Sequence, residues 1–131
     1  MKDDIRVILA DNNVQDRESK KRLLNEQGIQ VVYETGDGKK ALENIKKLKP
    51  DVVVMDMILP GVDGLEILEE CREFTEYKPL FIIATALRRE GLIEQALAQG
   101  ANYYMMKPLS VISQMASRHR KYLHSLHRHA E

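Results

Sequence analysis

Four polar side chains of the kind used in phosphoryl chemistry follow short apolar runs of this sequence. They are Asp11 after RVILA, Asp56 after VVVM, Thr85 at the end of LFIIAT, and Lys107 after YYMM. Carboxylates suit Mg²⁺, which favours one or two acidic ligands together with waters and phosphate oxygens. A carboxylate beside such an ion can attack a phosphoryl group, while a lysine and a hydroxyl hold the oxygens being transferred. The residue types therefore predict phosphoryl chemistry if the fold brings these side chains together.

Strand-like and helix-like segments alternate along the chain and would have to position those residues. Short apolar runs bounded by turn residues predict strands, here over residues 5–10, 29–33, 52–56, 80–85 and 103–106. Capping residues, apolar spacings of three and four, and closing glycine or proline predict helices, here over residues 14–27, 38–49, from 64, around 92–99 and from about Ser110. The pattern is five strand–helix units in a row.

This alternation predicts a single α/β domain with a parallel sheet, because each parallel crossover needs a covering helix. For five strands we expect the flavodoxin-like, doubly wound (βα)5 fold with strand order 2-1-3-4-5. Ligands bind such open sheets at the switch point, which here lies between the first and third strands. Asp11 and Asp56 would meet in that crevice, with Thr85 and Lys107 at the following strand ends.

Composition limits the setting. The chain is 44% hydrophobic and 31% charged, as is usual for a globular domain. Lys+Arg and Asp+Glu number 20 each, so we expect neither direct nucleic-acid contact nor membrane contact from charge alone. The single Cys71 fits a reducing compartment, and the initial MKDDIRVILA is not typical of a signal peptide. A cytoplasmic location is therefore expected.

Several spaced segments carry a family likeness. LADNN, VVVMDMILPGVDGLE, IIATA and GANYYMMKP together resemble the receiver domains of bacterial response regulators, over roughly residues 4–118. We therefore expect a receiver domain at residues 1–118. Residues 119–131 would form the end of the last helix, or a basic, histidine-rich tail leading toward an output domain.

The resemblance implies a role for each polar strand-end residue. Asp56 would take a phosphoryl group from a sensor histidine kinase or a histidine phosphotransferase, and Thr85 and Lys107 would contact the phosphate. Mg²⁺ would be the cofactor, held by Asp11, Asn12, Asp56 and the backbone carbonyl of Ile58. By the same likeness the domain is not an enzyme toward other molecules and catalyses only its own phosphotransfer and dephosphorylation.

The resemblance also implies a switch. Thr85 and Tyr104 would respond to the phosphate and change the face formed by helix 92–99, strand 103–106 and the last helix. Control of an output, expected to be transcription, and homodimerisation would use that face. Within the family, ADNN and YYMMKP look closest to the receiver of the sporulation master regulator, a transcription factor fed by a phosphorelay.

Three positions bear on how such a site would behave. Receivers usually have two adjacent acids after the first strand, but here the second is Asn12, whose amide can ligate a cation without adding charge. This departure supports an alternative, a pseudo-receiver that acts as a phosphorylation-independent protein-interaction module. Ile58 and Leu87 stand where receivers flank the approach of water, and both are bulky and apolar, so a long-lived phosphorylated state is expected.

Simpler interpretations remain for single residues. Asp56 alone could be a turn or cap residue, Asp63 is expected to be a turn residue rather than a ligand, and Tyr104 could serve packing alone. A flavodoxin-like nucleotide or flavin binder is disfavoured because no glycine-rich phosphate loop follows the first strand. The clustered histidines indicate a basic helix end rather than a metal site; they are His119, His124, His127 and His129.

Overall fold

The computed structural model describes residues 5–86 and 89–106. Within them the chain forms five strands, β1 (Arg6–Ala10), β2 (Gln30–Thr35), β3 (Val52–Met55), β4 (Leu80–Thr85) and β5 (Tyr103–Met106). Four helices alternate with these strands, α1 (Val14–Glu26), α2 (Gly38–Leu48), α3 (Gly64–Arg72) and α4 (Glu90–Ala98). The helix expected from Ser110, the tail at 119–131 and its four histidines lie outside the described residues.

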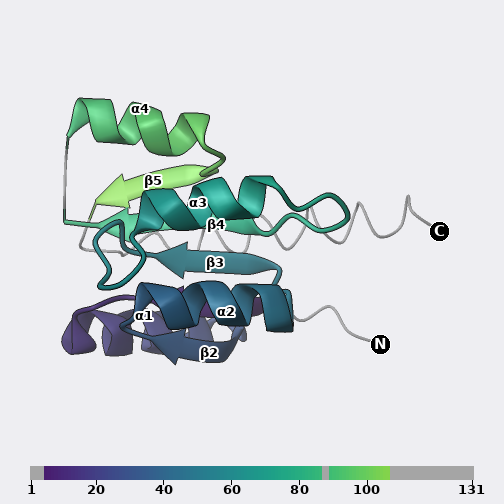
Figure 1. Cartoon of the computed structure of the whole chain (residues 1–131). Helices are drawn as coiled ribbons and strands as arrows, with labels where there is room; N and C mark the ends of the chain where they lie inside the picture. The colour runs from purple at the N-terminus through teal and green to yellow at the C-terminus, as the bar shows by residue number, and fades with distance from the viewer. Residues whose placement is uncertain (1–4, 87–88, 107–131) are drawn as a thin grey trace.

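The strands form one parallel sheet in the order β2-β1-β3-β4-β5, which confirms the expected flavodoxin-like order. Ala10 is paired with Met55 on one side of β1 and with Thr35 on the other. On the far side of β3, Met55 is paired with Ile83 of β4. All arrows in Figure 1 point the same way, so the carboxyl ends of the strands meet at the left edge of that view.

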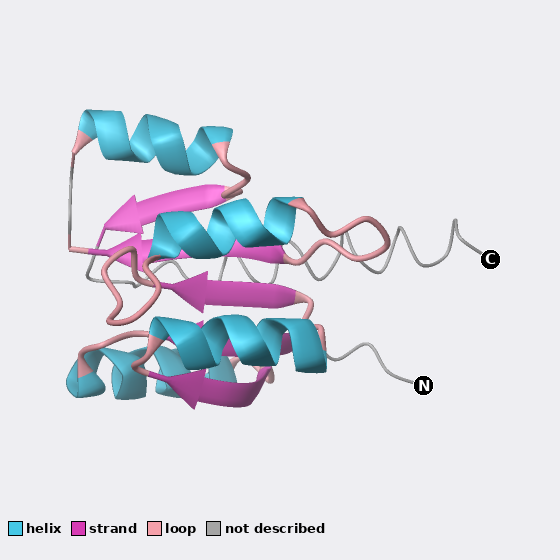
Figure 2. Ribbon diagram, viewed as in Figure 1, coloured by secondary structure: helices cyan, strands magenta, loops and turns pink. Residues whose placement is uncertain are grey.

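Helices cover both faces of the sheet. In Figures 1 and 2, α2 and α3 lie in front of the strands, α4 lies at the top beside β5, and α1 lies behind the strands. Alternate strand residues accordingly feed two separate cores. The front core joins residues such as Val53 and Ile83 to the apolar sides of α2, α3 and α4. The core on the α1 side joins the intervening residues, such as Val54 and Ile82, to Leu24 of α1.

Polar caps fix where the helices begin. The Asn13 side chain accepts a hydrogen bond from the Asp16 amide at the start of α1, and Asp37 does the same for α2. Asp63 and Glu66 form a reciprocal capping box at the start of α3, so Asp63 has the structural role that the sequence predicted. α2 ends at Leu48, and the next residue, Lys49, adopts a left-handed conformation with φ 47° just before Pro50. The loops at the carboxyl edge are thus anchored by short polar side chains.

Boundaries differ from expectation mainly at β2, which runs to Thr35 instead of ending near Tyr33. This strand is at the edge of the sheet and its residues from Val31 onward are half-buried, so no buried apolar run marks its end. No helix among the described residues is long and apolar enough to cross a membrane.

Candidate functional site

Asp11 and Asp56 lie at the ends of neighbouring central strands. The Asp56 amide donates to the Ala10 carbonyl at 2.9 Å, and the Asp11 amide donates to the Thr35 carbonyl at 3.0 Å. These bonds continue the β1–β3 and β1–β2 ladders by one step beyond the strands. Both acids are therefore fixed at the switch point, as the sequence predicted.

The Asp56 carboxylate contacts β4 directly. The Thr85 hydroxyl donates to Asp56 Oδ1 at 2.6 Å, and the Ile58 amide reaches the same oxygen at 3.3 Å. Asp56 is half-buried, whereas Thr85 is buried. The sequence-predicted pair Asp56 and Thr85 is thus brought into contact, and two donors reach the same carboxylate oxygen.

The loop after β3 is held so that one apolar residue is exposed close to Asp56 in the chain. Met57 and Leu59 are buried, while Ile58 between them is 59% exposed. Gly64 donates to the Met57 carbonyl at 2.8 Å, and Gly38 donates to the Pro60 carbonyl at 2.9 Å. A Cβ at Gly38 would lie 1.6 Å from the Val62 carbonyl oxygen, so only glycine fits there. The loop that carries Ile58 is therefore rigidly anchored to α2 and α3.

Asp11 has a partner that the sequence analysis did not identify. Lys20, on α1, places its ammonium 2.5 Å from Asp11 Oδ2 and 3.1 Å from the Ala84 carbonyl oxygen. The two side chains are almost wholly buried, with 1% of Lys20 and none of Asp11 exposed. Asp11 Oδ1 accepts from the Asn13 amide at 2.9 Å. Both carboxylate oxygens of Asp11 are therefore engaged within the protein.

The signal for Lys20 was its spacing. It stands one helical turn before Leu24, and these two are the buried residues of α1. Val14, an apolar residue in the first turn of the same helix, is 59% exposed. A lysine four residues before a leucine lies on the same face of the helix. Once Leu24 is known to be buried, Lys20 is expected to be a buried cation that needs a partner.

The donor set can be compared with what Mg²⁺ requires. Asp11, Asp56 and the Asn12 amide are oxygen ligands of the right type at adjacent strand ends, and Asn12 is exposed. Among residues 5–86 and 89–106, no group of three or more His, Cys, Asp or Glu side chains is placed to hold a metal ion. The site therefore fits a hard cation in ligand chemistry but offers it little negative charge.

Tyr104 lies on β5, paired with Ile83, and packs against the front core. Burial raises the pKa of its hydroxyl, and the negative charge of Asp56 raises it further. Tyr104 is thus within electrostatic reach of Asp56, while its neighbour Tyr103 packs against the opposite core. Lys107 and Leu87, also expected near the site, lie outside the described residues.

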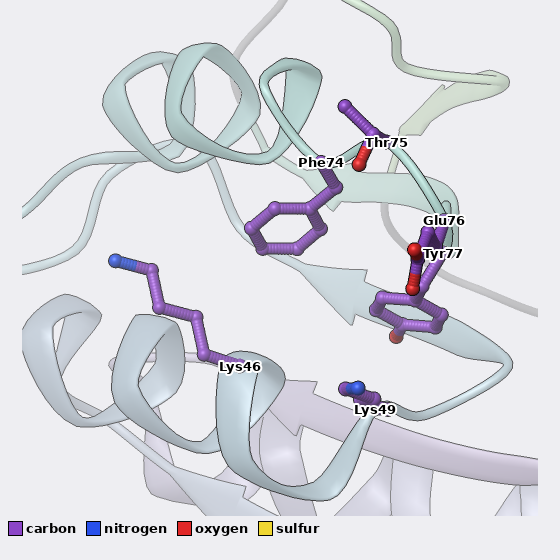
Figure 3. Close-up of a pocket in the computed structure, with 6 residues that line it drawn as sticks. All are labelled: Lys46, Lys49, Phe74, Thr75, Glu76 and Tyr77. Carbon is purple, nitrogen blue, oxygen red and sulfur yellow. The ribbon is translucent and has the colours of Figure 1, made fainter.

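A pocket of about 230 Å³ lies elsewhere on the molecule. Lys46 and Lys49 at the end of α2 line it together with residues 74–77 after α3, as Figure 3 shows. The Tyr77 hydroxyl donates to the Pro50 carbonyl just before β3, which places this pocket at the amino edge of the sheet. It is therefore remote from Asp56 and is no part of the candidate site.

Comparison with known proteins decides the family. The model of the response regulator receiver domain matches residues 7–117. The chain belongs to the response regulator receiver family. Receivers are signalling modules that work with kinases or phosphotransfer proteins, rather than enzymes acting on separate substrates.

Individual relatives agree with this assignment. The transcriptional regulatory protein PdtaR of Mycobacterium tuberculosis is 34% identical over 106 residues, which are 81% of this chain and 51% of PdtaR. This receiver therefore spans about half the length of that relative. The receiver domain of NarL from the same organism superposes with a TM-score of 0.84 at 31% identity, covering 90% of this chain and 97% of that one.

A third comparison shows the fold alone. CheY in the CheX–CheY–BeF₃–Mg²⁺ complex of Borrelia burgdorferi has a TM-score of 0.79 at 24% identity, covering 91% of this chain and 89% of that one.

Proposed function

We propose that this receiver takes a phosphoryl group on Asp56. The observation that carries the proposal is the pairing of an acid at the end of β3 with the Thr85 hydroxyl, 2.6 Å away, at the switch point of the sheet. The donor would be a phosphohistidine on a sensor kinase or a phosphotransferase. An Asp56 oxygen attacks phosphorus, the P–N bond breaks, and its electron pair leaves with the imidazole, which then takes up a proton.

The residues around Asp56 can stabilise the transferred group. The Thr85 hydroxyl and the Ile58 amide are hydrogen-bond donors already directed at the carboxylate. We assign Lys107 as the residue that would hold a phosphate oxygen by its charge, because it follows β5 at the same edge. Fixed donors of this kind stabilise charge without reorganising during the reaction.

Mg²⁺ is the proposed cofactor. Asp11, Asp56, the Asn12 amide and the Ile58 carbonyl are the oxygen donors that would hold it. When bound, the ion would offset the negative charge that collects as phosphate oxygens approach a carboxylate. The solved CheY complex contains this ion.

The proposed switch couples Asp56 to Tyr104. Thr85 already contacts Asp56, so a phosphoryl group would become the new acceptor for its hydroxyl. Tyr104 lies on β5, the strand next to β4, which ends at Thr85. The negative charge of Asp56 raises the pKa of the Tyr104 hydroxyl. New negative charge and acceptor oxygens would then change the face formed by α4, β5 and the helix expected from Ser110.

The coupling can be tested with a phosphoryl analogue. Beryllofluoride with Mg²⁺ should shift the amide resonances of Tyr104 and α4 as well as those of Asp56 and Thr85. Shifts confined to the immediate surroundings of Asp56, with Tyr104 silent, would contradict the switch.

Partner, output and domain limits complete the proposal. We assign residues 1–118 to the receiver and residues 119–131 to the start of a connection toward an output. That output is proposed to be transcriptional, in a cytoplasmic protein whose receivers dimerise through the α4–β5 face without touching nucleic acid or membrane. The likeness to the sporulation regulator stays a prediction.

A pseudo-receiver is the second candidate. Two observations favour it, the neutral Asn12 beside Asp11 and the ammonium of Lys20 on the Asp11 carboxylate. In this case the same α4–β5 face would bind a partner protein whether or not Asp56 carries phosphate.

One labelling experiment separates the two candidates. The protein is incubated with acetyl phosphate, with and without Mg²⁺, and its intact mass is measured. The proposal expects one added phosphoryl group that needs the metal and disappears in Asp56→Asn. Asp63→Asn is the matched control, because Asp63 only caps α3 and should label normally. Failure of the unmodified protein to label at any Mg²⁺ concentration would favour the pseudo-receiver.

A further inference from the structure

Lys20 is a buried cation at the carboxyl edge of the sheet. Its side chain leaves α1, is 1% exposed and ends on Asp11 and Ala84. We propose that Lys20 is the resident counter-cation of Asp11 and that it competes with Mg²⁺, so that this receiver binds the metal only weakly. The inference deepens the proposed function, on which its relevance to phosphorylation rests.

The position of the ammonium is fixed from both sides. Asp11 follows β1 and Ala84 belongs to β4, and β3 lies between these strands in the sheet. The ammonium therefore connects the end of β1 to β4 across the carboxyl end of β3, the strand that leads into Asp56. Its distances are 2.5 Å to Asp11 Oδ2 and 3.1 Å to the Ala84 carbonyl oxygen. A charge-assisted bond this short is among the stronger contacts a protein makes.

A second cation of α1 reinforces the effect. Arg17 donates from its guanidinium to the backbone carbonyl of Asp11 at 2.6 Å, and its Nε lies 3.3 Å from Glu34. Asn12, beside Asp11, adds no negative charge. Two positive side chains and one neutral amide thus surround the acid that would bind the metal.

Competition follows from the burial of Lys20. A metal ion that takes Asp11 Oδ2 must replace the ammonium on that oxygen. The lysine side chain is only 1% exposed, so its charge has no short route to water and stays near the ion. Repulsion between cations at such distances is strong wherever water is excluded. The same arrangement explains how the Asp11 carboxylate can be buried, because the Lys20 ammonium balances its charge within the fold.

The test measures Mg²⁺ binding without any phosphoryl donor. Amide NMR titration gives the dissociation constant for the unmodified protein, for Lys20→Met and for the control Lys21→Met. Lys21 is the next residue of α1, and its ammonium pairs with Glu34 at 2.6 Å on the surface. Removing the buried charge should tighten binding by about tenfold or more. Lys21→Met should leave the constant nearly unchanged because solvent screens that charge.

Two further measurements keep the proposal testable if Lys20→Met is poorly folded. Mg²⁺ should raise the melting temperature of Lys20→Met far more than that of the other two proteins, because the ion replaces the missing counter-charge. In the unmodified protein, the ¹⁵N resonance of the Lys20 ammonium should shift only at the high Mg²⁺ concentrations that move the Asp11 amide. Equal Mg²⁺ affinities for Lys20→Met and Lys21→Met, or equal gains in melting temperature, would overturn the inference.

These outcomes are separate from those of the labelling experiment. If Asp56 takes phosphate but Lys20→Met binds Mg²⁺ no more tightly, the competition is wrong and the proposed function stands. If Lys20→Met binds Mg²⁺ more tightly but Asp56 takes no phosphate in either protein, the competition stands and the proposed function is wrong.

Discussion

The two edges of the sheet hold their loops by opposite means. At the carboxyl edge, polar side chains make short contacts: the buried ammonium of Lys20 with Asp11, and the buried hydroxyl of Thr85 with the half-buried Asp56. At the amino edge, the rings of Phe74 and Tyr77 stack with centroids 5.8 Å apart, and the Tyr77 hydroxyl caps the Pro50 carbonyl. Aromatic packing on a backbone anchor is a stabilising arrangement, whereas buried charge is costly unless it is paired. The difference indicates that the amino edge contributes to stability and that the carboxyl edge holds the groups suited to chemistry.

The contrast recurs along one helix. Lys20 and Lys21 are consecutive residues of α1, and each ends on a carboxylate at nearly the same distance. The first pair is sealed in the carboxyl edge, and the second lies at the surface with 38% of the lysine side chain exposed. The two ion pairs have similar distances but should contribute differently to stability, because solvent screens the Lys21 pair and hardly reaches the Lys20 pair.

The largest expected effect breaks the buried pair. Lys20→Met should lower the free energy of unfolding by about 3–5 kcal/mol, because it removes the buried ammonium that faces the buried Asp11 carboxylate. Lys21→Met should change it far less. Urea denaturation in metal-free buffer measures both. A double variant, Asp11→Asn with Lys20→Met, should recover much of the loss because it removes both charges of the buried pair. Equal destabilisation by the two lysine substitutions would remove the distinction between the pairs.

The next prediction concerns Ile58, the exposed apolar residue two positions after Asp56. Ile58 is held outside the core and cannot orient water by hydrogen bonding, so phosphoryl-Asp56 should be long-lived. The double variant Ile58→Asn with Leu87→Glu should speed loss of phosphate by about tenfold, less than the roughly 100-fold or more that a general acid or base contributes. Decay is followed by intact mass at saturating Mg²⁺ so that weak metal binding does not limit it.

A matched control sharpens the lifetime test. Val14→Asn changes another exposed apolar residue at the same edge of the sheet, one that the family likeness does not place beside the phosphate. It should leave the decay unchanged. An unaltered rate in the Ile58 and Leu87 double variant would show that water reaches the phosphate by another path.

The smallest effect is expected at the amino edge. Tyr77→Phe keeps the ring stack but leaves the Pro50 carbonyl without that hydroxyl, which should cost about 1 kcal/mol. Labelling of Asp56 should be unchanged, since the substitution touches nothing at the carboxyl edge. Denaturation and acetyl phosphate labelling of the same sample measure both quantities. Altered labelling would mean that the two edges are coupled.

Most of the fold was predictable because apolar runs bounded by turn residues recur along the sequence. β4 and β5 were expected at the residues where they occur, since each is an apolar run between turn residues. β2 was placed two residues too short because its last residues, Glu34 and Thr35, are polar on a half-buried edge strand. Local patterns therefore located the buried elements better than the edge.

The site was predictable only in part. Asp11, Asp56 and Thr85 follow apolar strands, so topology alone placed them together. Lys20 could not be placed in the same way, because a lysine in a polar helix has the appearance of a surface residue until its helical face is known. Its contact with Ala84 joins residues 64 positions apart, which no local pattern encodes.

The central claim is that Asp56 is the residue that carries phosphate, and chemical mapping tests it most directly. The protein is labelled with acetyl phosphate and Mg²⁺, reduced with borohydride, and digested for peptide sequencing by mass spectrometry. Reduction converts an aspartyl phosphate to homoserine and leaves free carboxylates intact. The account predicts homoserine at position 56 and unmodified acids at Asp11 and Asp63. Homoserine at either of those positions, or at none, would contradict it.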